Sequence, residues 1–348
     1  MGKIVNTSIF LALLFAACNK EGEIIDAIDK VFPEHDAITF SSFNQEEEAV
    51  TRATTPLNDD FTVWGYKTMS VDMVQKVFQG YKVKYVAGSG GSTADNTDNY
   101  SYVNGTDQDI KYWDFAASGY NFWGYTGGNY DESSNTLTIS ELSQSVTEPD
   151  VKDKMFSSIY HRSPVSKDVV QLQFKRPYAK VRMMFYCSDA IDDGDKVEIG
   201  ASTFVPESPN QLITRGVLEV TYSQSGNASE TYKTTSTTTA DHLSFDPVNL
   251  TNESGTASNN AALAKPSDGT DYYYVIPYDY NQAFTLSTTI DGDVKTATLP
   301  KEFMNWKPNF VYTYLFKITE ASKKIEFYEV KIDPWKYGGS QNEEWKNW

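Results

Sequence analysis

The feature that most constrains the fold is a succession of short segments in which apolar and polar residues alternate. Residues 61–66, 120–125 and 284–290 are examples, and each segment is rich in aromatic or β-branched side chains. Alternation with a period of two turns one face of a strand toward a core and the other toward solvent. Convincing helical periodicity is almost absent, so the sequence predicts an all-β chain built from β-sandwich domains.

Turn and loop signals separate these segments. The pair Asp291-Gly292 readily adopts the positive φ of a tight hairpin. Residues 223–260 are mostly Ser, Thr, Asn and Glu, which indicates a long exposed loop, and the segment 69–78 fits either a helical turn or a loop beside a strand. Further strands are expected at 37–43, 83–86, 110–115, 169–174, 179–186, 196–199, 216–222, 272–276, 294–299, 310–318 and 324–332.

Three of the expected strands carry a more detailed prediction. The aromatic segments 110–115 and 120–125 are close enough in sequence to be neighbours in one sheet. The segment 324–332 changes its alternation phase midway, which indicates a β-bulge.

The chain has 348 residues, a length that suits about two folded domains. The polar run at 189–195 is the best place for a boundary between them. We therefore expect a lipoprotein signal peptide (1–17), a tether (18–36), an N-terminal β-sandwich (37–188), a C-terminal β-sandwich (189–333) and a C-terminal tail (334–348).

The N-terminus has the features of a lipoprotein export signal. Lys3 is followed by an apolar run from Ile9 to Ala17, which is too short to span a bilayer as a helix. Small residues stand directly before Cys18, as a lipoprotein signal peptidase requires, so we expect Cys18 to carry the lipid, including palmitate. Cys187 is then left without a disulfide partner, and the fold must rest on a hydrophobic core.

Composition argues against several classes of function. The formal net charge of −17 disfavours binding to nucleic acid or to an anionic membrane surface. The three histidines lie far apart, and Gly-x-Ser-x-Gly, His-Glu-x-x-His and Cys-x-x-Cys motifs are missing, so we expect no enzyme and no cofactor. An acidic run lacks the spacing of a calcium loop and is better explained as a solvated turn: Asp189, Asp192, Asp193 and Asp195.

The tryptophans leave two interpretations open. Exposed Trp64, Trp113 and Trp123 would form a platform on which sugars stack, and the chain would then be a surface glycan-binding lipoprotein. All three fall in expected strands, where aromatic side chains more often fill the core of a sandwich. We favour the core.

Three groups of residues resemble the fimbrillin family, the pilus subunits of Gram-negative anaerobes. Lys307-Pro308-Asn309 stands where that family usually has Pro-Gly-Lys before its Tyr-x-Tyr strand. The order and spacing of the groups, between about Ala37 and Trp335, make a chance match unlikely. The groups are the aromatic segments 111–115 and 120–125, the strand–basic turn–strand segment 170–181, and the series 274–277, 284–286, 299–300, Trp306 and 312–316.

The resemblance implies two transthyretin-like, Greek-key β-sandwich domains in tandem and a role as a structural subunit of surface fimbriae. In that family an Arg-specific or trypsin-like protease cuts the lipoprotein precursor in an N-terminal loop, and here Arg52 and Ala53 stand at that place. The first strand then leaves, and a strand from another subunit takes its position. The displaced strand would carry Ile38, Phe40 and Phe43.

The C-terminal tail is the candidate donor of the replacing strand. It carries Trp335, Trp345 and Trp348 on a polar chain that has little local reason to pack on its own domain. Expected partners are other fimbrial subunits, the processing protease, an adhesion target, and the outer membrane through the lipid of the precursor. A chain that is never cut at Arg52 would instead keep its lipid and act as a fimbrial anchor that does not polymerise.

Overall fold

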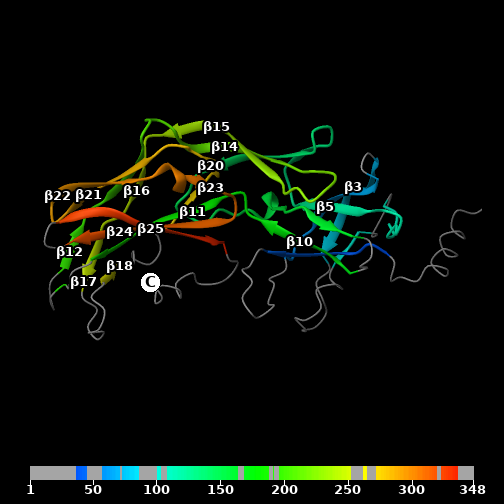
Figure 1. Ribbon diagram of the computed structural model, residues 1–348, viewed down its shortest axis with the longest axis horizontal. Helices are drawn as coiled ribbons and strands as arrows, with labels where there is room; N and C mark the ends of the chain where they lie inside the picture. Colours follow the sequence, from blue (N-terminus) through cyan, green and yellow to red (C-terminus); the bar gives the residue numbers. More distant parts are fainter. Residues whose placement is uncertain are drawn as a thin grey trace, which may run out of the picture.

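The computed structural model describes residues 37–44, 57–70, 73–85, 100–102, 108–163, 168–187, 191, 196–251, 262–264, 272–319 and 323–335. Strands dominate this part of the chain, and the only helical elements in it are the short 3₁₀ turns η3 (Lys152–Lys154) and η4 (Lys301–Phe303). The predicted all-β class is confirmed (Figure 1).

The strands follow one another as β1 (Phe40–Asn44), β2 (Phe61–Ser70), β3 (Met73–Tyr85), β4 (Tyr100–Ser101), β5 (Gly119–Tyr125), β6 (Asn129–Asp131), β7 (Thr136–Ser143), β8 (Phe156–Ser157), β9 (Tyr160–Arg162), β10 (Val170–Lys175), β11 (Ala179–Cys187), β12 (Lys196–Ile199) and β13 (Ser202–Pro206). The second half contains β14 (Leu212–Thr221), β15 (Thr231–Ala240), β16 (Leu243–Phe245), β17 (Val248–Thr251), β18 (Ala262–Ala264), β19 (Tyr273–Val275), β20 (Tyr278–Asp279), β21 (Phe284–Ile290), β22 (Asp293–Leu299), β23 (Asn305–Trp306), β24 (Phe310–Thr319) and β25 (Lys324–Pro334).

The first half of the chain forms an eight-stranded sheet in the order β1-β10-β8-β5-β2-β3-β4, with β9 paired to β5. Its central strands are buried on both faces because each face packs against other aromatic residues. On one face Trp123 of β5 stacks on Tyr222, which follows β14, at a ring distance of 4.9 Å. On the other face Phe122 meets Phe40 of β1 at 5.8 Å.

The second half forms a sandwich of two sheets. A five-stranded sheet has the order β18-β11-β24-β25 with β19 on β11, and a six-stranded sheet has the order β16-β13-β21-β12-β17 with β22 on β21. Aromatic side chains from both sheets meet between them, as in the contact of Phe204 with Tyr314 at 5.7 Å. This core is separate from that of the first half.

A four-stranded sheet, β15-β14-β7-β6, joins the two halves. The hairpin β14–β15 comes from beyond the expected boundary at residues 189–195, yet Leu218 and Val220 of β14 belong to the first hydrophobic core. In Figure 1 this hairpin lies above the junction of an elongated molecule. The buried apolar residues up to Tyr178 belong to the first core, and the second core begins at Ala179. The division into an N-terminal and a C-terminal domain stays a prediction, and neither core is a continuous stretch of sequence.

Several local predictions hold. Asp291 and Gly292 have φ values of 49° and 90° and form the turn between β21 and β22. The bulge expected in the last strand is present, because Leu315 pairs with Glu329 whereas Phe316 pairs with Phe327, which leaves Tyr328 as the extra residue.

Three local predictions are wrong. Residues 110–115 make only an isolated bridge, between Tyr112 and Ala37, because the chain turns at Asp114, whose carboxylate accepts the N–H of Ala116. Residues 69–70 lie in β2 and residues 73–78 lie in β3, the strand paired with it, rather than in a helical turn or loop. The expected loop at 223–260 contains β15, β16 and β17, since its threonines suit a strand and β15 pairs with β14 along its length.

Candidate functional site

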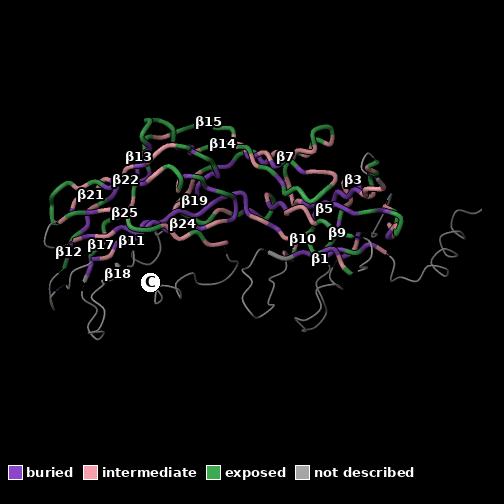
Figure 2. Tube along the Cα trace, in the orientation of Figure 1, coloured by how far each residue is buried: buried purple, intermediate pink, exposed green. Residues whose placement is uncertain are grey.

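The candidate site is β1 and the surface on which it lies. β1 pairs in parallel with β10, from Phe40 opposite Val170 to Asn44 opposite Phe174, at one end of the eight-stranded sheet. Figure 2 shows the two strands side by side. Backbone hydrogen bonds also hold the residues just before β1. The N–H of Val170 donates to the carbonyl of Thr39 at 2.8 Å, and the N–H of Ile38 donates to the carbonyl of Lys111 at 2.8 Å.

The side chains of β1 are part of the core. Ile38 is fully buried, and Phe40 is 1% exposed with its ring 5.0 Å from Phe78 and 5.9 Å from Tyr102. On the same face, two residues further along the strand, the buried hydroxyl of Ser42 donates to the hydroxyl of Tyr100 at 2.6 Å. Burial of a phenylalanine side chain contributes roughly 1.5–3 kcal/mol to stability, so β1 is a structural strand. This agrees with the expectation that alternation at 37–43 marks a strand with Ile38 and Phe40 inward.

Removal of β1 would leave a specific surface, which we call the β1 seat. It consists of the free edge of β10 together with the apolar residues Phe78, Tyr102, Phe122, Val170 and Leu172. Unpaired N–H and C=O groups beside an apolar groove are a template on which another strand can pair. The seat therefore has the chemistry of a strand-acceptor site.

The remaining predicted site residues divide into two groups. Cys18, Arg52, Ala53, Trp345 and Trp348 lie outside the described residues. Phe43 lies in β1 opposite Gln173.

Trp335 corrects the expectation of a tail without local packing. It is 1% exposed, and its backbone N–H donates to the backbone carbonyl of Asn309 at 2.8 Å. Its ring packs on Tyr274 at 5.4 Å and belongs to the first hydrophobic core, although β25, which it follows, lies in a sheet of the second half. The folded part of the chain thus extends through Trp335.

Two cations cover the ring of Trp335. The guanidinium of Arg176 lies 4.6 Å from the ring centre and the ammonium of Lys180 lies 4.3 Å from it. The carboxylate of Glu148 is 4.0 Å from Arg176 and 3.9 Å from Lys180. Burial, only partly offset by Glu148, lowers the pKa of Lys180 to about 8. This arrangement attaches the end of β25 to the turn between β10 and β11.

Sequence reasoning missed this arrangement. The basic turn Arg176-Pro177 and the following Lys180 form one local motif, and Trp335 lies in another near the C-terminus. Their contact joins residues that are far apart in sequence, and nothing in either local pattern indicates it.

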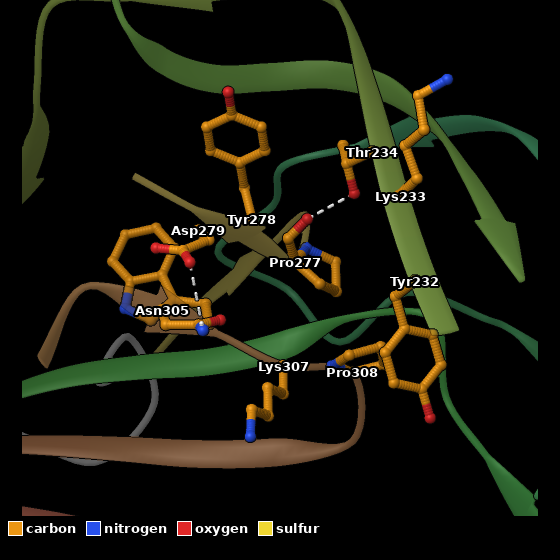
Figure 3. A pocket seen from close by; sticks show the side chains of 10 residues that line it. Tyr232, Lys233, Thr234, Pro277, Tyr278, Asp279, Asn305, Lys307 and Pro308 are labelled. Atoms are coloured by element: carbon orange, nitrogen blue, oxygen red, sulfur yellow. Dashed lines mark hydrogen bonds between the residues drawn. The ribbon is translucent and has the colours of Figure 1, made fainter. Parts of the chain in front are cut away.

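A second surface feature is a pocket of about 400 Å³ between β15, β20 and β23, shown in Figure 3. Its walls include Thr234 of β15, Pro277 and Tyr278 near β20, and Asn305 and Pro308 near β23. No local sequence pattern indicates this pocket, because its walls come from three separated segments.

The tryptophans proposed as a sugar platform are buried. Trp64, Trp113 and Trp123 all belong to the first hydrophobic core, so the preferred core interpretation is confirmed. Within the described residues no group of His, Cys, Asp or Glu side chains could hold a metal ion. Nor do these residues include a helix of the length and hydrophobicity needed to cross a bilayer.

Comparison with known proteins identifies the family. A family model described as fimbrillin-like matches residues 49–335. A fimbrial protein from Bacteroides vulgatus is 14% identical over 86% of this chain and 100% of its own, with a TM-score of 0.42. A candidate cell adhesion protein from Bacteroides uniformis is 14% identical over 86% and 99% of the two chains, with a TM-score of 0.41.

No curated protein sequence matches the chain. The fimbrillin-like match covers most of the sequence and agrees with the resemblance in its motifs. The chain therefore belongs to the fimbrillin-like family.

Proposed function

We propose that this protein is a structural subunit of surface fimbriae, made as a lipoprotein precursor and assembled by strand exchange after cleavage between Arg52 and Ala53. The observation that carries the proposal is the position of β1: a buried strand that precedes Arg52 in the sequence. The fimbrillin-like match begins at residue 49, after β1, which supports a mature subunit that lacks this strand.

Cleavage at Arg52 changes how β1 is held. In the intact chain β1 is tethered to its seat, so a competing strand faces a very high effective concentration of the native one. After cleavage only non-covalent contacts retain β1, namely its ladder with β10 and the packing of Ile38 and Phe40. A strand from a second subunit that makes equivalent contacts can then replace it, and the lipid on Cys18 leaves with the displaced segment.

The tail after Trp335 is the proposed donor. Trp335 is buried in its own subunit, so the segment proposed to enter a neighbouring seat is residues 336–348, which carry Trp345 and Trp348. An adhesion target and the processing protease complete the expected partners. In this role the protein needs no catalytic group.

A precursor that is not cut would behave differently. It would keep β1 and the lipid on Cys18 and would serve as an anchor at the outer membrane. The fold is compatible with this alternative, because β1 is well packed before cleavage.

The experiment is N-terminal sequencing of the subunit in sheared surface filaments, with Arg52→Ala and Arg215→Ala variants. Arg215 is an exposed arginine of β14 and serves as the matched control. We expect filament subunits that start at Ala53, assembly of the Arg215→Ala protein, and a lipidated monomer for Arg52→Ala. Lipid-modified Cys18 in every filament copy would refute strand exchange and favour the anchor.

A further inference from the structure

The pocket between β15, β20 and β23 shares no residue with the β1 seat and has polar and aromatic side chains in its lining. We propose that it binds a neutral saccharide. Its volume of about 400 Å³ falls within the roughly 300–1,000 Å³ range of small-molecule sites. The proposal does not depend on cleavage or polymerisation, because every residue of the pocket follows Arg52 in the sequence.

A carboxylate and a carboxamide stand side by side at the rim. Asp279 of β20 and Asn305 of β23 are register partners, and the Asn305 amide donates to the Asp279 carboxylate over a long distance of 3.4 Å. Both side chains are exposed, so they keep capacity for further hydrogen bonds. A carboxylate that accepts and an amide that both donates and accepts match the neighbouring hydroxyl groups of a sugar ring.

Hydrogen bonds to the surrounding structure hold the Asp279 carboxylate and the backbone of Asn305. The other oxygen of the Asp279 carboxylate accepts the N–H of Asn281 at 3.2 Å. The backbone carbonyl of Asn305 accepts a hydrogen bond from the hydroxyl of the buried Tyr312 at 2.9 Å, and the same hydroxyl accepts one from the N–H of Lys307 at 2.8 Å. The main chain that carries the amide is therefore held in place, which lowers the entropy lost on binding.

Tyr278 supplies an aromatic surface beside the polar pair. It is 38% exposed, whereas most aromatic rings of the described residues are buried. Its edge packs on Tyr280 at 4.9 Å, and Tyr280 rests in turn on Trp306 at 5.1 Å, so buried rings support the exposed one. The C–H face of a sugar ring can stack on such a surface while its hydroxyls bind polar groups.

The charges favour a ligand without a net charge. Asp279 would repel an anionic sugar, and the lining also contains Lys233 and Lys307, which disfavour a cation. Figure 3 shows the two lysine ammonium groups at opposite ends of the group of side chains, pointing away from Pro277 and Pro308. Lys233 also pairs with Glu219 at 3.3 Å. Neither lysine thus places a cation at the centre of the pocket.

The neighbouring edge of β15 is less suited to an added peptide strand at this point. The hydroxyl of Thr234 donates to the carbonyl of Pro277 and bridges β15 to the segment before β20 (Figure 3). Pro277 and Pro308 also lack N–H groups for a ladder. A compact ligand fits the space better than an extended peptide.

The test is saturation-transfer NMR and calorimetry on the folded protein with a fixed panel of probes. The neutral probes are glucose, galactose, mannose, fucose, N-acetylglucosamine and N-acetylgalactosamine, each as the free sugar and as a β1,4-linked or α1,2-linked disaccharide where one exists. Glucuronic acid and glucosamine are the charged comparators. We expect at least one neutral probe to bind with a dissociation constant of about 1 mM, equivalent to roughly −4 kcal/mol, and to bind more tightly than either comparator.

Variants locate the binding. Tyr278→Ala and Asp279→Ala should each weaken binding of that probe by about tenfold or more, because each removes an aromatic surface or a charged hydrogen-bond partner. Tyr328→Ala and Asp293→Ala are the matched controls, since Tyr328 is an exposed tyrosine and Asp293 an exposed aspartate in other strands. Absence of binding by every neutral probe, preference for a charged comparator, or unchanged binding by both pocket variants would each overturn the proposal.

Discussion

Glu230 shows how one buried carboxylate can join separate parts of this fold. Its carboxylate accepts hydrogen bonds from the ammonium of Lys175 at 2.5 Å, the hydroxyl of Tyr232 at 2.5 Å and the backbone N–H of Ile159 at 3.1 Å. Lys175 ends β10, and Tyr232 lies in β15 of the crossing hairpin. Burial alone would raise the pKa of Glu230, but Lys175 and the hydrogen bonds outweigh it and hold that pKa below its ordinary value.

We predict that Glu230→Gln lowers the free energy of unfolding by about 3 kcal/mol at pH 7, because the variant leaves the Lys175 ammonium buried without its counter-ion. The folded-state pKa of Glu230 is depressed, so this stabilisation is complete above the unfolded-state pKa of about 4.3 and disappears as pH falls through the lower folded-state value. Urea unfolding at pH 7, 5, 4 and 3 should therefore show the two proteins converging in acid.

Glu219→Gln is the matched control for this change. Glu219 of β14 pairs with Lys233 of β15 at 3.3 Å, but this pair lies at the surface. Such exposed pairs contribute less than about 1 kcal/mol. A Glu230→Gln protein no less stable than Glu219→Gln at pH 7 would contradict the assigned role of the buried carboxylate.

Gly292 allows a prediction about backbone conformation alone. Its φ is 90°, and a Cβ placed there would meet nothing within 4 Å. Gly292→Ala should therefore cost about 1 kcal/mol through conformation and not through a clash. Gly292→Asn should cost less, because asparagine tolerates positive φ, and thermal unfolding of both variants would show the order. Equal losses would mean that the turn rearranges.

Prediction from sequence succeeded at the element scale where alternation and turn chemistry agree with pairing. The strand β1 and the inward direction of Ile38 and Phe40 followed from period-two alternation, and the β21–β22 turn followed from Asp291-Gly292. The strand β15 was missed because its Thr-rich residues carry little hydrophobic pattern. Its stability comes from pairing with β14, a contact that the composition of β15 cannot reveal.

The candidate site was predictable only in part, for a related reason. Local pattern identified the strand that occupies the β1 seat, but the seat itself combines Phe78 of β3, Phe122 of β5 and Leu172 of β10. The rims of the β20–β23 pocket likewise come from segments far apart in sequence. Pairing between distant strands decides both surfaces, and a single sequence holds no direct signal for it.

The β1 element should act as a separable ligand of its seat. Protein cut after Arg52 and freed of residues 1–52 should bind a peptide of residues 37–44, because the peptide restores the ladder with β10 and fills the apolar groove. Replacing Phe40 by Ala in the peptide should weaken binding by about 100-fold or more, the equivalent of losing a buried phenylalanine. Fluorescence anisotropy of a labelled peptide measures both.

A peptide with Thr39→Ala is the control for that experiment. The Thr39 side chain is exposed, and its contact with Val170 uses the backbone carbonyl, so binding should be unchanged. If the Phe40→Ala and Thr39→Ala peptides bind equally well, the seat does not recognise β1 through its core side chain.

At the scale of the whole molecule, the two halves depend on each other. The hairpin β14–β15 of the second half completes the first core, and Trp335, after the last strand of the second half, packs into that core as well. Two independent domains in tandem would show neither contact. We therefore expect the halves to unfold together rather than one at a time.

The buried Trp335 and the proposed donor segment after it allow monomer stability to be tested separately from assembly. A chain that stops after Trp335 should unfold within about 0.5 kcal/mol of the full chain, whereas one that stops after Pro334 should lose about 3–5 kcal/mol, because Trp335 fills a buried site beneath Arg176 and Lys180. If residues 336–348 donate the exchanged strand, the chain that stops after Trp335 should form no filaments after cleavage at Arg52, and electron microscopy checks this. Its β1 seat should still bind the peptide of residues 37–44. Filaments of normal length from that protein would show that another segment of the chain is the donor, since the seat and the fold would both be intact.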